Sequence, residues 1–322
     1  MTLKIGNYNA YKLGLDARGS AAWNARVTAV RELAPDFLGL QEIVVDEDAT
    51  PPAQWDAVAA QTITGFAEDC GLTATVPATP ARPHGTAMAA NTHRSWYTAV
   101  LWNPASGAHV PGSYRPLGAP DFWHGLTTAG FDIGAVEPLT VVSYHGHPGS
   151  PVWRTEEARR IKMILRRTGG VKPSIVVGDF NALSAARVPG PDGTLRYYDA
   201  EAYAAQRHDD LEYQVQDGSI GGEQLADRRQ TEMLLRDGYM VDAAAHLGAP
   251  WQATVGHWPD GQGDPDPWGE RRIDLILVSR PVAPALTAYG VMDSEAALAG
   301  SDHRIVWTTL APAGIAATER GR

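Results

Sequence analysis

The feature that most constrains the fold is an apolar run that ends abruptly in polar side chains. In residues 175–181, an Ile-Val-Val run leads through a glycine into Asp179 and Asn181. Short apolar runs of this kind are typical of buried strands, so the pattern predicts a strand that delivers polar groups to a sheet edge. Taken alone, the pattern is as typical of a structural turn as of a functional site.

The same pattern recurs at four other places. Asn9 ends the first apolar run, Glu42 ends the second, His145 ends a later one, and Asp302 with His303 precedes the last. Carboxylate and amide oxygens suit a hard cation such as Mg²⁺, and histidine changes its charge near neutral pH. This combination at strand ends indicates a metal-assisted phosphate ester hydrolase.

The order of these segments resembles the endonuclease/exonuclease/phosphatase superfamily, typified by deoxyribonuclease I, over residues 3–307. The matching segments are Asn9, Gln41-Glu42, His145 with Pro148, Gly178-Asp179-Phe180-Asn181, Asp274, and Ser301-Asp302-His303. The resemblance implies an α/β fold, a four-layer αββα sandwich in which two packed mixed β-sheets are flanked by helices. It also implies a phosphoesterase that uses Mg²⁺ or Mn²⁺, and it leaves one ion or two open.

The periodicity of the sequence is consistent with two sheets packed face to face with helices outside. Strands are predicted at residues 3–9, 37–42, 72–76, 96–102, 139–145, 174–179, 272–279 and 305–310. Helices are predicted at residues 21–33, 53–69, 152–167 and 229–236, with Ser20 as the cap of the first. Residues 77–91, 104–134 and 183–228 read as loops; the last either shapes substrate selection or is a solvated excursion.

Length and composition favour one domain. The 322 residues are 44% hydrophobic and 20% charged, as in ordinary soluble enzymes. We expect a single domain over residues 1–312 and a disordered tail over 313–322. No apolar stretch is long enough to cross a bilayer, a leader has no room before the 3–9 strand, and Cys70 is the single cysteine, so we expect a cytoplasmic location. The sequence leaves the oligomeric state open.

The charge balance argues against tight, processive binding to DNA. The chain has 27 basic and 37 acidic residues, a net charge of −10, whereas such binding depends on Lys and Arg contacts to phosphates. The acidic run at 260–266 lacks the turn glycine of a calcium loop and reads as a plain loop. The densest basic group reads as a solvated helix face and comprises Arg159, Arg160, Lys162, Arg166 and Arg167.

Glu42 is the leading metal ligand. Hydrolysis of a phosphodiester needs a cation to neutralise the phosphate, and Glu42 stands where the family carries its metal glutamate. Asn9 and Asp302 are expected to complete the metal site, directly or through water. The alternative is that Glu42 caps the segment that follows it. The sequence holds no Cys/His cluster with zinc spacing and no glycine-rich phosphate loop.

A second group of residues is expected to handle protons. Asp274 interrupts an apolar run and needs a partner if buried; the resemblance pairs it with His303, which would orient or deprotonate the attacking water. Asp179 and Asn181 would hold the water, a phosphoryl oxygen or a second ion.

His145 is the candidate general acid for the leaving oxygen. Its His-Gly-His-Pro segment matches the family's His-x-x-Pro, with His147 as the alternative and a purely structural histidine as the competing interpretation. Relatives partner this histidine with a glutamate on a first-half strand, whereas residues 94–97 hold no carboxylate. Either another acid substitutes, or His145 acts mainly as a donor to the phosphate.

The leading hypothesis is a divalent-metal phosphodiesterase that acts on nucleic acid or nucleotides. The alternative is a phosphomonoesterase for a small phosphorylated metabolite, which suits the acidic net charge. A non-catalytic binding protein on the same fold is disfavoured, because clustered carboxylates without a task would repel one another.

Overall fold

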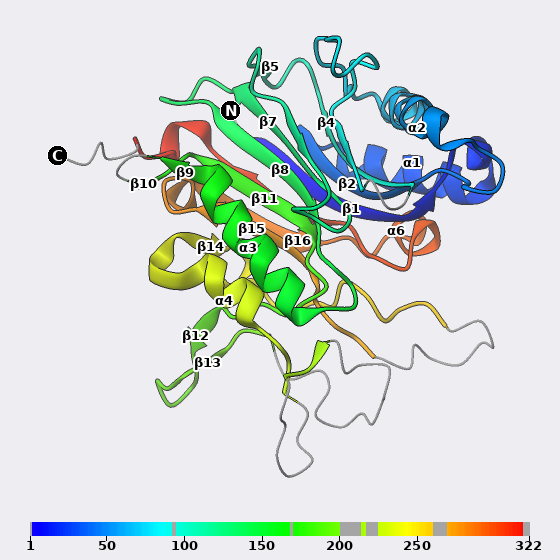
Figure 1. Ribbon diagram of the computed structural model, residues 1–322. Helices are drawn as coiled ribbons and strands as arrows, with labels where there is room; N and C mark the ends of the chain where they lie inside the picture. Colours follow the sequence, from blue (N-terminus) through cyan, green and yellow to red (C-terminus); the bar gives the residue numbers. More distant parts are fainter. Residues whose placement is uncertain are drawn as a thin grey trace.

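The computed structural model describes residues 2–91, 95–167, 170–199, 214–216, 225–259 and 269–317. Two β-sheets lie face to face, and helices lie against both outer faces (Figure 1). This arrangement is the four-layer αββα sandwich that the sequence predicts.

The first sheet contains the first and the last strand of the chain. In spatial order its six strands are β16 (Leu286–Val291), β17 (Val306–Leu310), β1 (Leu3–Leu13), β2 (Phe37–Val44), β4 (Trp96–Trp102) and β3 (Met88–Ala90). β1 and β2 run parallel, and the other neighbours are antiparallel. Its outer face packs against α1 (Ala21–Leu33), α2 (Trp55–Cys70) and α6 (Glu295–Gly300).

Ser20 begins α1 as predicted, since its side chain accepts a hydrogen bond from the backbone N of Trp23 at 3.1 Å. Trp23, Val27 and Val30 recur at helical spacing and are buried, so they pack α1 onto the sheet.

The second sheet contains the strands that end or begin at His145, Asp179 and Asp274. Its main path is β14 (Met240–Asp242), β15 (Asp274–Ser279), β11 (Ser174–Asp179), β8 (Leu139–His145), β7 (Leu126–Asp132) and β5 (Ala108–His109), with β6 (Arg115–Leu117) paired to β7. β8 and β11 run parallel. Its outer face packs against α3 (Pro151–Leu165) and α4 (Arg229–Leu235), and α5 (Ala243–His246) follows β14.

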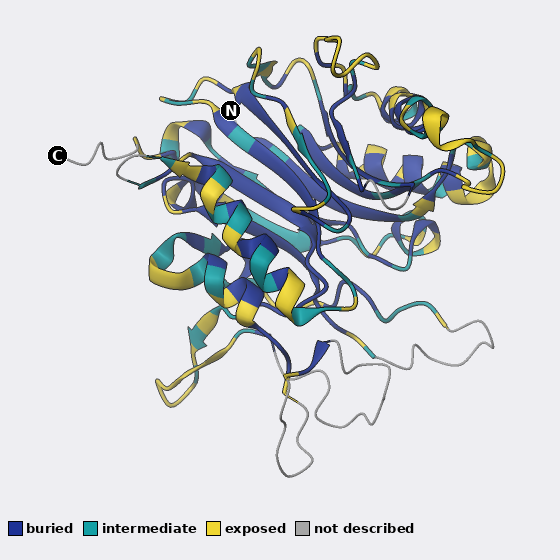
Figure 2. Cartoon of the chain, in the orientation of Figure 1, coloured by how far each residue is buried: buried dark blue, intermediate teal, exposed yellow. Residues whose placement is uncertain are grey.

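The core has three layers, one between the sheets and one under each set of helices. The strands are largely buried, while the helices expose their outward faces (Figure 2). Polar pairs also cross between the sheets: Gln41 donates to Ser143 Oγ at 2.9 Å, and the Thr98 and Thr127 hydroxyls lie 2.9 Å apart. These pairs join β2 to β8 and β4 to β7, one strand of each sheet in both cases.

Several predicted boundaries were wrong. The predicted loop 104–134 contains β5, β6 and β7, and the predicted loop 77–91 contains β3. The predicted strand 72–76 forms only isolated bridges at Thr73 and Thr75. The helix predicted at 152–167 ends at Leu165, because the chain turns there into a short hairpin of β9 (Arg166–Arg167) and β10 (Gly170–Val171).

The predicted loop 183–228 contains a hairpin of β12 (Arg187–Pro189) and β13 (Leu195–Tyr197), while 200–213 and 217–224 lie outside the described residues. Most of the acidic run, from residue 260 onward, also lies outside them. Of the expected tail, residues 313–317 are described and Ile315 is buried in the core. Among the described residues, no helix is long and apolar enough to span a bilayer.

Candidate active site

Three neighbouring strands of the second sheet bring their polar ends to one level. Asp179 of β11 stands opposite His145 of β8 on one side and Asp274 of β15 on the other. His145 Nε2 lies 3.5 Å from Asp179 Oδ2. The strand register therefore assembles these three residues, as the polar strand ends predict.

The first sheet contributes two amides from alternate positions of β1. Asn7 Nδ2 donates to Asp274 Oδ1 at 3.2 Å, and Asn9 Nδ2 donates to Asp179 Oδ2 at 3.1 Å. Asn9 Nδ2 also lies 3.1 Å from Glu42 Oε1, to which it donates, and 3.4 Å from His303 Nε2. Asn9 is thus the link between the carboxylates of the two sheets.

Glu42 reaches this cluster through a bulge in β2. In a regular strand Glu42 would point away from the face that Gln41 occupies. The register between β2 and β4 shifts between Leu40 and Ile43, and Glu42 has a left-handed φ of 57°. A bulge of this kind re-aims a side chain, and here it turns the Glu42 carboxylate towards Asn9.

The end of β1 supplies backbone donors to the same two side chains. Tyr11 and Lys12 are both left-handed, with φ of 45° and 52°. The Tyr11 backbone N donates to Asn9 Oδ1 at 3.1 Å, and the Lys12 backbone N donates to Glu42 Oε2 at 3.1 Å. The first contact fixes which way the Asn9 amide faces, so its NH₂ group is turned to the carboxylates.

Asp274 and His303 form a buried dyad. His303 Nδ1 lies 2.8 Å from Asp274 Oδ2, which leaves Nε2 facing Asp179 Oδ2 at 3.8 Å. Ligand atoms of Asp179, Asp274 and His303 are all within 4.8 Å of one another, so they also form a possible metal-binding group. Because Asp274 already accepts from Asn7 and pairs with His303, the geometry favours a histidine-orienting role for Asp274.

Burial dominates the electrostatics of the acidic groups. It raises the pKa of Glu42, to which the nearby Asp302 charge adds, and it raises the pKa of Asp179 to about 7, to which Asp274 adds. Buried carboxylates with raised pKa values favour a bound proton or cation. Glu42 and Asp179 both contact Asn9, and the Asp302 charge acts on Glu42, so these carboxylates offer oxygen atoms of the kind that a hard divalent cation prefers.

The protein environment shifts the pKa values of His303 and His145 in opposite directions. Burial opposes the charged form of His303, but Asp274 and Asp179 outweigh it and raise the pKa of His303 well above its usual value. Burial, with His124 and His303, lowers the pKa of His145 well below its usual value. His303 is thus held as the charged partner of two carboxylates, and His145 as a neutral imidazole.

Asn181 and Asp302 complete the set that the sequence singles out. The Asn181 backbone N donates to Asp179 Oδ1 at 2.9 Å, and Asn181 Nδ2 donates to the Gly146 carbonyl at 3.1 Å. Asp302 is half-buried beside Ser301, whose hydroxyl donates to the Asn9 carbonyl at 2.7 Å. All eight predicted site residues therefore lie at the same end of the sandwich.

Three supporting residues were missed by the sequence analysis. Asn7 shares a strand face with Asn9, and period-2 spacing could have found it. Arg26 is buried and donates from Nε to Gly300 O at 2.7 Å and from Nη2 to Tyr11 O at 2.8 Å. His124 stacks on His145 with ring centroids 4.1 Å apart and planes 18° apart. Only tertiary packing places Arg26 and His124, so no local pattern reveals them.

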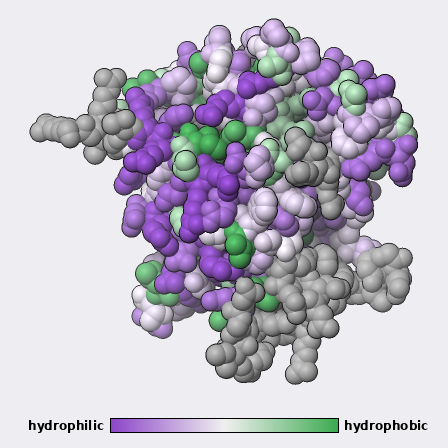
Figure 3. All heavy atoms as spheres, viewed as in Figure 1, coloured by the Kyte–Doolittle hydropathy of each residue, from purple (hydrophilic) through white to green (hydrophobic). Residues whose placement is uncertain are grey.

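The basic group predicted as a solvated face spans the second half of α3 and β9, and the surface over α3 is largely hydrophilic (Figure 3). Three of its arginines pair with neighbouring carboxylates: Arg159 with Glu156, Arg160 with Asp121, and Arg167 with Glu137. These pairs support the interpretation as a solvated face.

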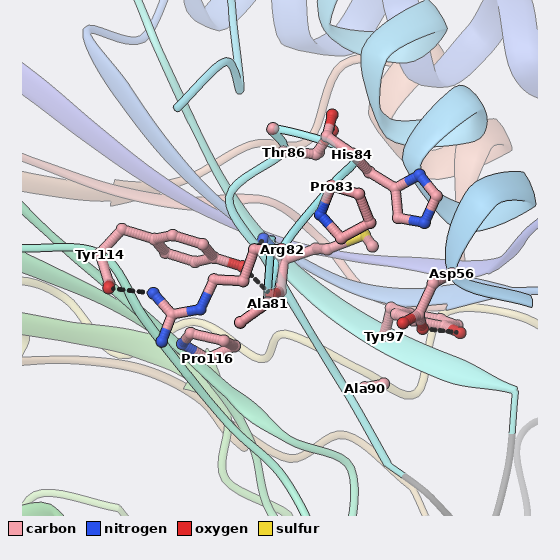
Figure 4. Close-up of a pocket in the computed structure, with 12 residues that line it drawn as sticks. Asp56, Ala81, Arg82, Pro83, His84, Thr86, Ala90, Tyr97, Tyr114 and Pro116 are labelled. Atoms are coloured by element: carbon pink, nitrogen blue, oxygen red, sulfur yellow. Dashed lines mark hydrogen bonds between the residues drawn. The ribbon is translucent and has the colours of Figure 1, made fainter. Parts of the chain in front are cut away.

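A separate cavity of about 180 Å³ lies between α2, β3, β4 and the 81–86 segment (Figure 4). Its polar groups bond to each other: Tyr97 donates to Asp56 at 2.8 Å, and Arg82 donates to the Tyr114 carbonyl at 2.9 Å. None of the eight site residues lines it.

Comparison with known proteins identifies the family of this chain. A sequence model of the Endonuclease/Exonuclease/phosphatase family matches residues 6–303. No curated protein matched the sequence.

Solved structures of similar fold come from several sources. A family protein from Bacteroides thetaiotaomicron has 14% identity and a TM-score of 0.56, covering 96% of this chain and 97% of that one. Truncated TDP2 from Caenorhabditis elegans has 14% identity and a TM-score of 0.53, covering 96% and 98%. A mannosyl-6-phosphatase from Bacteroides thetaiotaomicron has 14% identity and a TM-score of 0.54, covering 95% and 98%. At 14% identity these structures show a shared fold and nothing more about this chain.

Proposed function

This chain belongs to the endonuclease/exonuclease/phosphatase family of phosphoester hydrolases, and we propose that it is a divalent-metal-dependent phosphodiesterase that cleaves nucleic acid or nucleotides. One observation supports this most: Asn9 joins Glu42 to Asp179 within hydrogen-bond distance of both, beside the Asp274–His303 dyad. Burying carboxylates of this kind destabilises the fold unless a cation or another partner offsets their charge.

The ion would be held by Glu42 and Asp302, with Asn9 contributing through water or through its hydrogen bonds to the carboxylates. When bound, Mg²⁺ or Mn²⁺ supplies charge neutralisation at the phosphate. Asp179 and Asn181 are the residues that would hold a second ion, if there is one, or else the water or a phosphoryl oxygen.

The dyad would handle the proton of the attacking water. Asp274 fixes the ring of His303 through Nδ1, so that Nε2 points towards Asp179. The two carboxylates hold the ring charged in the free protein, so His303 would have to release the proton on Nε2 before that nitrogen could accept one from a water placed beside Asp179. Because the negative charge of Asp274 stabilises the protonated ring, the dyad can hold that proton during turnover.

His145 would act on the leaving side. In relatives the matching histidine is paired with a glutamate. In this chain Asp179 is the nearby carboxylate, and His124 stacks on the His145 ring. Its lowered pKa favours a neutral donor to the phosphate in the free protein, and the negative charge of a bound phosphate would raise that pKa towards the protonated, acid form.

The second candidate is a phosphomonoesterase. The net charge of −10 favours a small substrate, and one solved structure of the same fold is a mannosyl-6-phosphatase. We also place the activity in the cytoplasm, which the single, buried Cys70 supports.

An assay panel separates these candidates. Wild-type protein with Mg²⁺ or Mn²⁺ is given single-stranded DNA, duplex DNA, RNA, bis-nitrophenyl phosphate and mononitrophenyl phosphate. The proposal predicts faster turnover of at least one diester than of the monoester. Preference for the monoester over every diester would establish the second candidate instead.

A further inference from the structure

A group of aromatic rings extends outward from His145 to the molecular surface. We call it the aromatic shelf, and its members are Trp96, Trp123, His124, His147 and Trp153. They come from the start of β4, the segment before β7, the segment after β8 and the first turn of α3. The shelf thus gathers rings from four separate segments at the site end of the sandwich.

The shelf is continuous with the candidate site. His124 stacks on His145 at 4.1 Å, and the Trp96 ring lies 5.3 Å from His124. Farther out, the Trp123 ring lies 6.4 Å from His124 and 4.4 Å from His147, and Trp153 lies 5.7 Å from His147. A chain of ring contacts therefore leads from the leaving-side histidine to solvent.

A buried carboxylate holds the shelf in place. Glu157 of α3 accepts hydrogen bonds from the Trp123 backbone N at 2.8 Å and from the His147 backbone N at 3.2 Å. Its second oxygen also accepts from the Tyr144 hydroxyl at 2.5 Å. Because Glu157 is fully buried, the two segments that carry these rings are fixed before any ligand arrives.

The outer rings are open to solvent. Trp153 is 39% exposed, and Trp96, Trp123 and His147 are half-buried. Simple packing explains buried rings such as His124, but it does not require indole faces at the rim of a phosphoesterase site. Stacking on such faces is how proteins bind unpaired bases without reading their sequence.

We propose that the aromatic shelf binds the nucleobase of the leaving nucleoside, so that the substrate is a nucleotide diester with unpaired bases. This inference rests on the proposed function, because it places the leaving group on the side of His145. Duplex DNA is a poorer fit, because its bases are already stacked and the net charge of −10 opposes a long phosphate backbone.

The test compares three small diesters in the presence of Mg²⁺ or Mn²⁺. They are thymidylyl-thymidine and its two analogues in which a tetrahydrofuran replaces one nucleoside or the other. The products identify which nucleoside leaves. Wild-type protein should prefer thymidylyl-thymidine over the analogue without the leaving base, and Trp153→Ala should reduce that preference by about 5- to 150-fold, mainly through KM.

Matched variants show whether the ring itself matters. Trp153→Phe keeps a π face and should retain most of the preference. Val152→Ala changes an exposed neighbour on the same helix and should retain all of it. An unchanged preference in Trp153→Ala, or a preference that depends on the other base, would overturn the proposal.

A binding measurement separates this inference from the proposed function. If wild-type protein cleaves none of these diesters and no diester of the assay panel, the proposed function fails, and calorimetric titration of thymidylyl-thymidine in chelator then decides the shelf alone. Binding that weakens in Trp153→Ala and persists in Val152→Ala supports the shelf. Equal binding by both variants, or none by wild type, contradicts it.

Discussion

At the scale of single residues, we propose that Asp274 serves the reaction through His303. Its carboxylate lies 2.8 Å from Nδ1, whereas Nε2 of the same ring lies 3.8 Å from Asp179 Oδ2. His303→Ala should therefore lower kcat by about 10²- to 10⁴-fold, and Asp274→Asn should lower it by a smaller factor.

The double variant of the dyad is the sharper measurement. Residues that act as a unit are not additive, so the double variant should be little worse than His303→Ala alone. Strictly multiplicative losses in kcat would show that Asp274 does not act through His303.

The role of His145 can be determined by comparing substrates with good and poor leaving groups. A proton donor matters most for a poor leaving group, so His145→Ala should lose far more rate on an alkyl diester than on bis-nitrophenyl phosphate. His145→Gln keeps an N–H donor but cannot act as an acid, and it should show the same selective loss. Equal losses on both substrates, rescued by glutamine, would instead assign His145 to phosphate binding.

At the scale of elements, the bulges of β1 and β2 aim Asn9 and Glu42, two residues of the proposed metal site. Lys12 is exposed and left-handed, and only its backbone N contacts Glu42. Lys12→Gly should raise the free energy of unfolding by up to about 1 kcal/mol, because glycine adopts φ of 52° without strain, and it should keep activity.

Urea unfolding and steady-state kinetics measure both parts of that prediction. Lys12→Pro is the contrasting variant, because proline lacks the N–H and cannot take a positive φ. It should lose stability and activity together. Loss of activity in Lys12→Gly would mean that the lysine side chain itself takes part.

α3 provides a pH-dependent test through Glu157. Burial raises the pKa of Glu157 from 4.5 to about 7, so the folded state keeps a proton that the unfolded state releases. Stability should thus fall as pH rises from about 4.5 to 7, by at most about 3 kcal/mol from this group.

The pH dependence of urea unfolding in wild type and Glu157→Gln isolates this contribution. Above pH 7 both states are deprotonated and the difference between the two proteins should level off. Parallel stability curves from pH 4.5 to 8 would show that Glu157 keeps an ordinary pKa.

At the scale of the whole molecule, much of the sandwich follows from the sequence. β4, β8 and β11 lie within the predicted bounds, because each is a short apolar run. β7 was missed because the residues between Leu126 and Phe131 are small or polar: Thr127, for example, is buried and bonds to Thr98 of the other sheet. Such a strand has too few large apolar residues in a row to be predicted as a buried strand.

The candidate site divides in the same way. Asp179, Asp274 and His145 stand at strand ends, as the sequence indicates. They come together because β11 pairs parallel with β8 and antiparallel with β15. Glu42 joins them only through a left-handed bulge, and the ring contacts of His124 join segments far apart in the chain. Both depend on tertiary structure, which no local pattern contains.

The central claim is that the cluster around Glu42 works with a divalent cation. The most direct test is the cleavage rate of a single-stranded oligonucleotide by metal-free protein before and after Mg²⁺ or Mn²⁺ is added, for wild type and Glu42→Gln. Wild type should be inactive in chelator and recover with either ion, whereas Glu42→Gln should keep the fold but stay at least about 100-fold slower. Full wild-type activity in chelator, or full activity of Glu42→Gln, would contradict the account.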